Sequence, residues 1–172
     1  AVLSFALVFG GFQIAASYSS ARLNAVMGHS GLVAMSASEF IDHIKDDNRS
    51  VYWLGPMTGK KYAFSFNHTQ DDRDIITYLP KGSNPANVNR PKLTIETYKN
   101  FAAYATDLHP LMVTNSAKLV TTSGITVEFN KASMDYEIVT FRGKPEIVII
   151  GYPTRQLATT LMKNANNLKL VG

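Results

Sequence analysis

The chain of 172 residues contains no cysteine. Disulfide bonds, thiol catalysis, and zinc or iron–sulfur centres held by cysteine are therefore excluded. The stability of the protein must come from packing, for which one tryptophan, eight tyrosines and nine phenylalanines supply large apolar side chains. Each such side chain contributes about 1.5–3 kcal/mol when it is fully buried.

Charged residues are also scarce, at 17% of the chain, against about 25% in average soluble domains. No charged residue precedes Arg22, and the net charge of +4 is spread over single residues or pairs such as Lys60 and Lys61. A nucleic-acid groove requires clustered basic residues with exposed aromatic residues between them. We therefore expect no nucleic-acid partner.

The uncharged N-terminal segment reads AVLSFALVFGGFQIAASYSSA and covers residues 1–21. As a helix it is about 32 Å long, enough to cross a hydrocarbon core of about 30 Å. A cleavable signal peptide is less well supported, because the positively charged n-region is missing. The large apolar residues expected to contact the lipid bilayer are Leu3, Phe5, Leu7, Val8, Phe9, Phe12 and Ile14.

These features predict three parts. Residues 1–21 form a transmembrane anchor helix, residues 22–35 form a short juxtamembrane linker, and residues 36–172 form an extracytoplasmic domain. The expected location is the cell membrane, with one membrane pass and the domain at the cell surface. A bare apolar N-terminus also occurs in type IV pilins, but the usual bacterial pilin has Glu at its fifth position, where this chain has Phe5.

A helix start is predicted beside the linker. Ser36 and Glu39 have the spacing of a capping box, and Met35 and Phe40 have the spacing of a hydrophobic staple. The signal predicts a helix over residues 36–46 that begins after a break in the chain. A pilin has one continuous helix through this region, so the signal favours an anchor followed by a separate domain.

The rest of the domain has the period-two alternation of β-strands. The fold class predicted is α+β, with an antiparallel β-sheet and two or three helices packed on one face. The expected strands are residues 51–54, 61–66, 74–79, 93–98, 118–121, 125–130, 136–141, 146–151 and 168–171. Further helices are expected at residues 100–108 and 154–165.

Turn residues between these strands predict three hairpins. The predicted pairs are 51–54 with 61–66, 118–121 with 125–130, and 136–141 with 146–151. Tyr52, Trp53 and Tyr62 on the first hairpin are a candidate interaction surface, although half of the rings on alternating strands should belong to the core.

No motif identifies a catalytic, cofactor-binding or metal-binding residue. The loop from Gly55 to Lys60 is one residue too short for a phosphate-binding loop and lies between strands. The four histidines lack the spacing of metal ligands. An envelope enzyme or sensor would need the fold to gather dispersed polar residues in one pocket, chosen from His43, His68, His109, Glu96, Glu128 and Asp135.

Three segments carry a resemblance to known sequences: YWLGP at residues 52–56, YLP at residues 78–80 and LTIETY at residues 93–98. The pattern YW-x-GP, YLP and LT-x-x-TY is similar to that of a group of uncharacterised actinobacterial single-pass membrane-anchored proteins. The resemblance covers roughly residues 36–172 and implies a one-domain topology. The group has no assigned activity, so the resemblance implies no catalytic residue.

We therefore expect a non-enzymatic, membrane-anchored protein without a cofactor. Its extracytoplasmic domain would bind a protein partner, associate with itself, or act as an accessory or structural subunit of a cell-envelope assembly. Two alternatives remain. One is a type IV pilin-like filament subunit, and the other is an envelope-associated enzyme or sensor.

Overall fold

A computed structural model describes residues 32–67, 73–85, 92–100, 102, 116–120, 124–131, 136–154 and 165–172. This part of the chain is mostly β, with a seven-stranded antiparallel sheet, a two-stranded sheet, one α-helix and one 3-10 helix. The predicted anchor helix over residues 1–21 lies outside the described residues. Among the residues described, no helix has the length and apolar character needed to span a membrane.

Helix α2, Ala37–Asp46, begins where the capping box predicts. The Ser36 hydroxyl accepts a hydrogen bond from the Glu39 amide, and the Glu39 carboxylate accepts one from the Ser36 amide. Phe40 and Ile44 are fully buried on the inner side of the helix. Residues 32–34 before the cap are not helical, so the predicted start of a new helix is confirmed.

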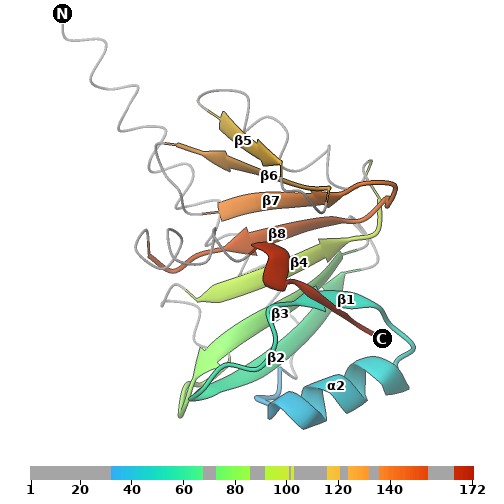
Figure 1. The fold of residues 1–172 in the computed structure, drawn as a ribbon. Helices are drawn as coiled ribbons and strands as arrows, with labels where there is room; N and C mark the ends of the chain where they lie inside the picture. Colours follow the sequence, from blue (N-terminus) through green and yellow to red (C-terminus); the bar gives the residue numbers. More distant parts are fainter. Residues whose placement is uncertain are drawn as a thin grey trace, which may run out of the picture.

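The large sheet has the strand order β2-β3-β4-β8-β7-β6-β5, and every neighbouring pair is antiparallel (Figure 1). Its strands are β2 (Lys60–Asn67), β3 (Arg73–Pro80), β4 (Leu93–Tyr98), β5 (Ser116–Val120), β6 (Ile125–Asn130), β7 (Tyr136–Phe141) and β8 (Ile147–Gly151). The hairpins β5–β6 and β7–β8 confirm two of the three predicted hairpins.

The remaining predicted hairpin, residues 51–54 with residues 61–66, is wrong. Strand β1, Val51–Trp53, does not pair with β2 but with β9, Lys169–Val171, near the other end of the chain. The Tyr52 amide donates a hydrogen bond to the Thr97 hydroxyl on β4 at 3.1 Å. Strand β1 therefore crosses the face of the large sheet, where a hairpin partner of β2 would lie at its edge.

Two buried tyrosines explain how the segment after β1 is held without a hairpin. The Tyr78 hydroxyl accepts a hydrogen bond from the Leu54 amide at 2.8 Å, and the Tyr62 hydroxyl accepts one from the Met57 amide at 2.7 Å. Side chains of β2 and β3 thus satisfy backbone groups that a hairpin ladder would otherwise bind. Gly55, at a φ of 82°, supplies the left-handed conformation that the segment needs.

Helix α2, strands β1 and β9, and the 3-10 helix η1 (Ala165–Asn167) all lie on one side of the large sheet, here called the covered face (Figure 1). Rings from α2, β1, β2 and β3 pack together there, with Phe40 and Trp53 centroids 5.4 Å apart and Tyr62 and Tyr78 centroids 5.1 Å apart. The sheet residues of this core are Tyr62, Phe64, Ile76, Tyr78, Leu93, Ile95, Val127, Val139, Val148 and Ile150.

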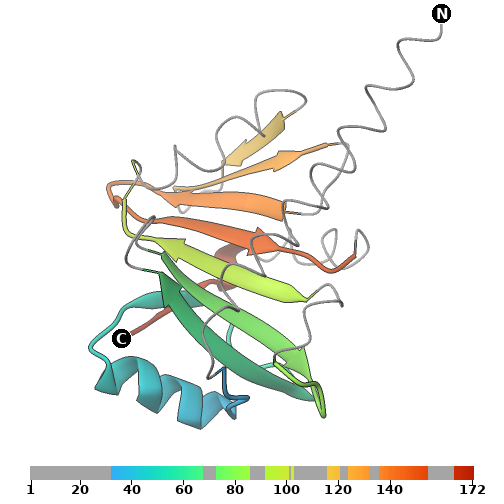
Figure 2. The ribbon, with the colours of Figure 1, turned by 180° about the vertical axis from the view of Figure 1, so that it is seen from behind.

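The opposite side of the sheet, here called the second face, is seen in Figure 2. The central strands are buried on this side too, and its large buried apolar side chains are Ile75, Leu79, Tyr98, Ile138, Ile147 and Ile149. The predicted helices at 100–108 and 154–165 lie largely outside the described residues. In the part described, the fold is thus mostly β with one short α-helix, where the sequence predicted two or three.

Candidate functional site

A buried ionic cluster lies at one end of strand β3, on the covered face. The Asp74 carboxylate is 1% exposed, and it accepts a hydrogen bond from the Arg49 guanidinium. Lys99 Nζ lies 3.1 Å from the other carboxylate oxygen and donates to the Ser50 carbonyl. The Arg49 guanidinium also stacks over the Phe66 ring at 4.2 Å. The cluster ties the loop after α2 to the sheet, and two cations already occupy its carboxylate.

A second buried ionic cluster lies on the second face. Arg73, which is 5% exposed, donates hydrogen bonds to the Tyr98 hydroxyl at 3.2 Å and to the Glu96 carboxylate at 3.4 Å. The Tyr98 hydroxyl donates to the same carboxylate at 3.1 Å. These three side chains bind one another, which is how a buried charge is made tolerable.

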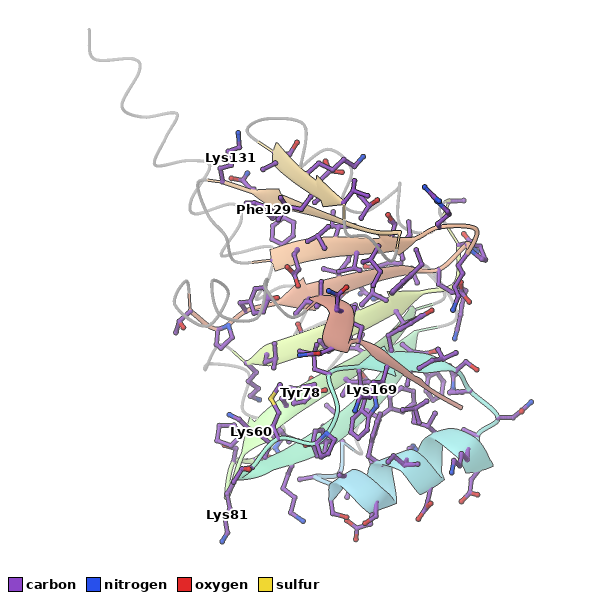
Figure 3. All side chains as sticks on the ribbon, viewed as in Figure 1. Lys60, Tyr78, Lys81, Phe129, Lys131 and Lys169 are labelled. Atoms are coloured by element: carbon purple, nitrogen blue, oxygen red, sulfur yellow. The ribbon has the colours of Figure 1, made fainter. Side chains whose placement is uncertain are left out.

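The third buried polar group is Glu137 on β7, which is fully buried on the covered face. It lies between Phe129 on β6, labelled in Figure 3, and Ile150 on β8. The Tyr152 hydroxyl donates a hydrogen bond to Glu137 Oε1 at 2.6 Å, while Oε2 is buried without a hydrogen-bond partner among the described residues. Burial raises the pKa of Glu137 to about 7, against the lowering effect of this hydrogen bond. Glu137 can therefore gain or lose a proton near neutral pH.

The residues considered for an enzyme are not brought together where the structure describes them. His43 lies on α2, and Glu96 and Glu128 lie on the second face, in one row but separated by β8 and β7. Three strand spacings place these two glutamates about 14 Å apart. Within the described residues, no three acidic or histidine side chains form a group that could hold a metal ion. The other residues considered, His68, His109 and Asp135, lie outside the described residues.

The predicted interaction surface at Tyr52, Trp53 and Tyr62 is wrong as an exposed surface. The exposed fractions of these three side chains are 4%, 4% and 1%. Trp53 and Tyr62 pack against Phe40, and Tyr52 stacks on Phe141 at 4.5 Å. The error arises because β1 crosses the covered face, which places its aromatic residues between two layers.

Lysines labelled in Figure 3 show how the basic residues are distributed. Lys60 begins β2 and Lys81 directly follows β3, near the β2 edge of the sheet, and Lys131 follows β6, near the β5 edge. Lys169 belongs to β9 on the covered face. The positive charge of these labelled residues is thus dispersed, as the sequence predicts.

Another exposed feature is strand β5, which lies at the edge of the large sheet. The exposed fractions are 53% for Leu119 and 69% for Val120. Within the described residues, only β6 pairs with β5, so no described strand pairs with its outer edge. The opposite edge of the sheet is different, because Met35 exchanges two backbone hydrogen bonds with Tyr62 on β2.

Sequence reasoning did not find these features, although signals existed for some. Glu137, Val139 and Phe141 are each two residues apart, so their side chains lie on the same side of β7. Asp74 and Ile76 are likewise two residues apart, so they share one side of β3. The exposure of β5 has no such signal, since it depends on which strand ends the sheet.

No family model, no curated protein and no solved structure matches the chain. The resemblance to actinobacterial membrane-anchored proteins stays a prediction. Among the described residues, β5 is a candidate site because two neighbouring apolar side chains, Leu119 and Val120, are exposed at the edge of the large sheet.

Proposed function

We propose that this protein is a membrane-anchored accessory or structural subunit of a cell-envelope assembly, and that its extracytoplasmic domain binds a protein partner through strand β5. The observation that carries the proposal is the exposed apolar edge of the large sheet. Most proteins blunt such edges with prolines, bulges, several charges or a covering segment. Strand β5 reads SAKLV, with one charge and no proline.

The two edges of the sheet support this proposal by their contrast. Strand β2 exchanges backbone hydrogen bonds with Met35 at Tyr62 and packs against α2, although Phe66 near its end is 50% exposed. Strand β5 leaves Leu119 and Val120 more than half exposed. A large apolar side chain contributes about 1.5–3 kcal/mol when it goes from full exposure to full burial, so covering these two would contribute about 2–4 kcal/mol. New ladder hydrogen bonds would each add about 1 kcal/mol.

Such binding energies are modest, but they are sufficient for stable association when both proteins are held in the same membrane. The uncharged segment over residues 1–21 supports an anchor, as argued from its length. When two proteins are held in one membrane, their effective concentration rises and a weak contact becomes well occupied. An accessory subunit can therefore use a short edge strand to join an assembly.

The experiment is site-specific photo-crosslinking of the full chain in its native membrane. A crosslinking residue is placed at Leu119 and, as the matched control, at Leu170 on β9, which is 49% exposed. We expect one identified protein to be crosslinked from position 119 and not from position 170. Leu119→Lys should then release that protein in mild detergent, while Leu170→Lys should retain it. Equal crosslinking from both positions, or none from position 119, contradicts the proposal.

A further inference from the structure

The side chains of β5 divide between the two faces of the sheet. Ala117 and Leu119 lie in register with Phe129 and Val127, on the covered face. Lys118 lies in register with Glu128 on the second face. A strand added beside β5 would place its own side chains directly opposite these, with the same alternation. The sequence of β5 therefore constrains the sequence of the strand that it can accept.

Lys118 is the only charged residue of β5, and its side chain is 64% exposed. Its Nζ lies 3.9 Å from Glu128 Oε2 on the inner side. A charge on an added strand would meet Lys118 from the outer side. An acidic residue there would continue a row of alternating charge over three strands, and opposite charges directly across a ladder stabilise it. A basic residue there would be repelled by Lys118.

A second copy of this chain fits the same edge less well. The antiparallel register that pairs all five residues of β5 with those of a copy places residue 116 opposite residue 120 and Lys118 opposite Lys118. Like charges directly opposite one another destabilise a ladder. The registers that avoid this contact pair fewer residues. Charge therefore favours a different protein as the occupant.

We infer that β5 accepts an extended segment of a partner protein in which an acidic residue faces Lys118 and an adjacent apolar residue faces Leu119. This inference rests on the proposed function of β5 as the binding strand, and it specifies the chemistry of the partner. The acidic side chain lies on the second face of the extended sheet. The apolar side chain covers Leu119 at the rim of the covered face, next to Val127 on β6.

The test uses two synthetic peptides, Thr-Val-Glu-Val-Thr and Thr-Val-Lys-Val-Thr, with both ends blocked. Each is titrated into the isotopically labelled full chain in detergent micelles, and the amide NMR signals of residues 116–120 are followed. We expect the acidic peptide to shift these signals with about tenfold higher affinity than the basic peptide. The amide signals of residues 60–67 on β2 serve as the internal control and should not move.

A charge-reversed variant makes the test specific. Lys118→Glu combined with Glu128→Lys keeps an opposite-charge pair between β5 and β6 but reverses the charge that faces the peptide. We expect this variant to prefer the basic peptide by a similar factor. The control variant Leu170→Lys should keep the preference for the acidic peptide.

The outcomes separate this inference from the proposed function. Equal affinity for the two peptides at β5 overturns the inference, while crosslinking from position 119 would still support β5 as the binding strand. A concentration-dependent dimer that pairs two β5 strands also overturns it, because the occupant is then a second copy. No shift at β5 with either peptide, together with no crosslink from position 119, overturns both.

Discussion

Replacing Glu137 by glutamine tests how the buried carboxyl group shapes the stability of the domain. Glutamine has nearly the same shape, and its Oε1 can still accept the hydrogen bond that Tyr152 donates to Glu137. The variant removes the ability to ionise, and the amide nitrogen that replaces Oε2 contributes equally at every pH. Its effect on the free energy of unfolding should therefore depend on pH, whereas a packing defect would act equally at every pH.

The direction of the effect follows from the raised pKa. Burial raises the pKa of Glu137 from the ordinary value of 4.5 to about 7. Between these values the folded protein keeps the proton and the unfolded chain releases it, so raising the pH favours unfolding. The stabilising contribution of the protonated carboxyl is complete below pH 4.5 and is lost as the pH rises through 7. The interval of about 2.5 pH units corresponds to about 3 kcal/mol, at about 1.4 kcal/mol per unit.

The measurement is urea unfolding of the full chain in mild detergent, followed by tryptophan fluorescence at a series of pH values between 4 and 8.5. Trp53 is the single tryptophan and is 4% exposed, so its emission reports unfolding of the core. Wild type and Glu137→Gln should have similar stability at pH 4.5. The variant should be more stable by about 3 kcal/mol at pH 8.

Two further variants show whether the carboxyl group is the cause. Glu128→Gln on the neighbouring strand β6 removes a partly exposed glutamate and serves as the surface control for the same substitution. Tyr152→Phe removes the hydrogen bond that lowers the pKa of Glu137, so the midpoint of the pH effect should move upward. If the curves for wild type and Glu137→Gln run parallel across this pH range, the assignment of a buried, protonated Glu137 is refuted.

Other predictions concern the groups that hold the fold together. Asp74→Asn should lower the free energy of unfolding by about 3 kcal/mol, measured in urea, because Arg49 and Lys99 lose a buried counter-charge. Tyr78→Phe should lower it by about 1–3 kcal/mol in the same assay, because the amide and carbonyl that its hydroxyl binds lose their partner. Gly151→Ala should lower the melting temperature, since a Cβ at residue 151 would lie 2.6 Å from the Thr94 hydroxyl. Adding Thr94→Ala should restore most of the loss, and no restoration would contradict the steric explanation.

Local sequence patterns were enough to locate most strands. The predicted bounds 93–98, 125–130 and 136–141 coincide with those of β4, β6 and β7. The capping box at Ser36 gave the start of α2 because cap and helix contact each other within four residues. These features depend on neighbours in sequence, and a single sequence contains that information.

Non-local pairing was not accessible in the same way. The turn residues after β1 resemble those of a hairpin, but the strand is completed by β9 and covered by the aromatic core. Burial on both sides of the central strands also removes the contrast between apolar and polar positions, as at Ile75 and Ile76. The sequence could therefore not show which aromatic residues face solvent, and Tyr52, Trp53 and Tyr62 were misplaced.

The pairing of β1 with β9 also has a kinetic consequence. Val51 and Val171 are partners in the ladder although nearly the whole domain separates them in sequence. The β5–β6 and β7–β8 hairpins can close early, whereas contacts between such distant residues form slowly because the loop that they close is long. During synthesis, the layer that contains Trp53 is incomplete until β9 has been made and has paired with β1. The folding rate of this protein should therefore be set by the pairing of β1 with β9. A mutation that slows the pairing of β9 would prolong the lifetime of a nearly folded, aggregation-prone intermediate.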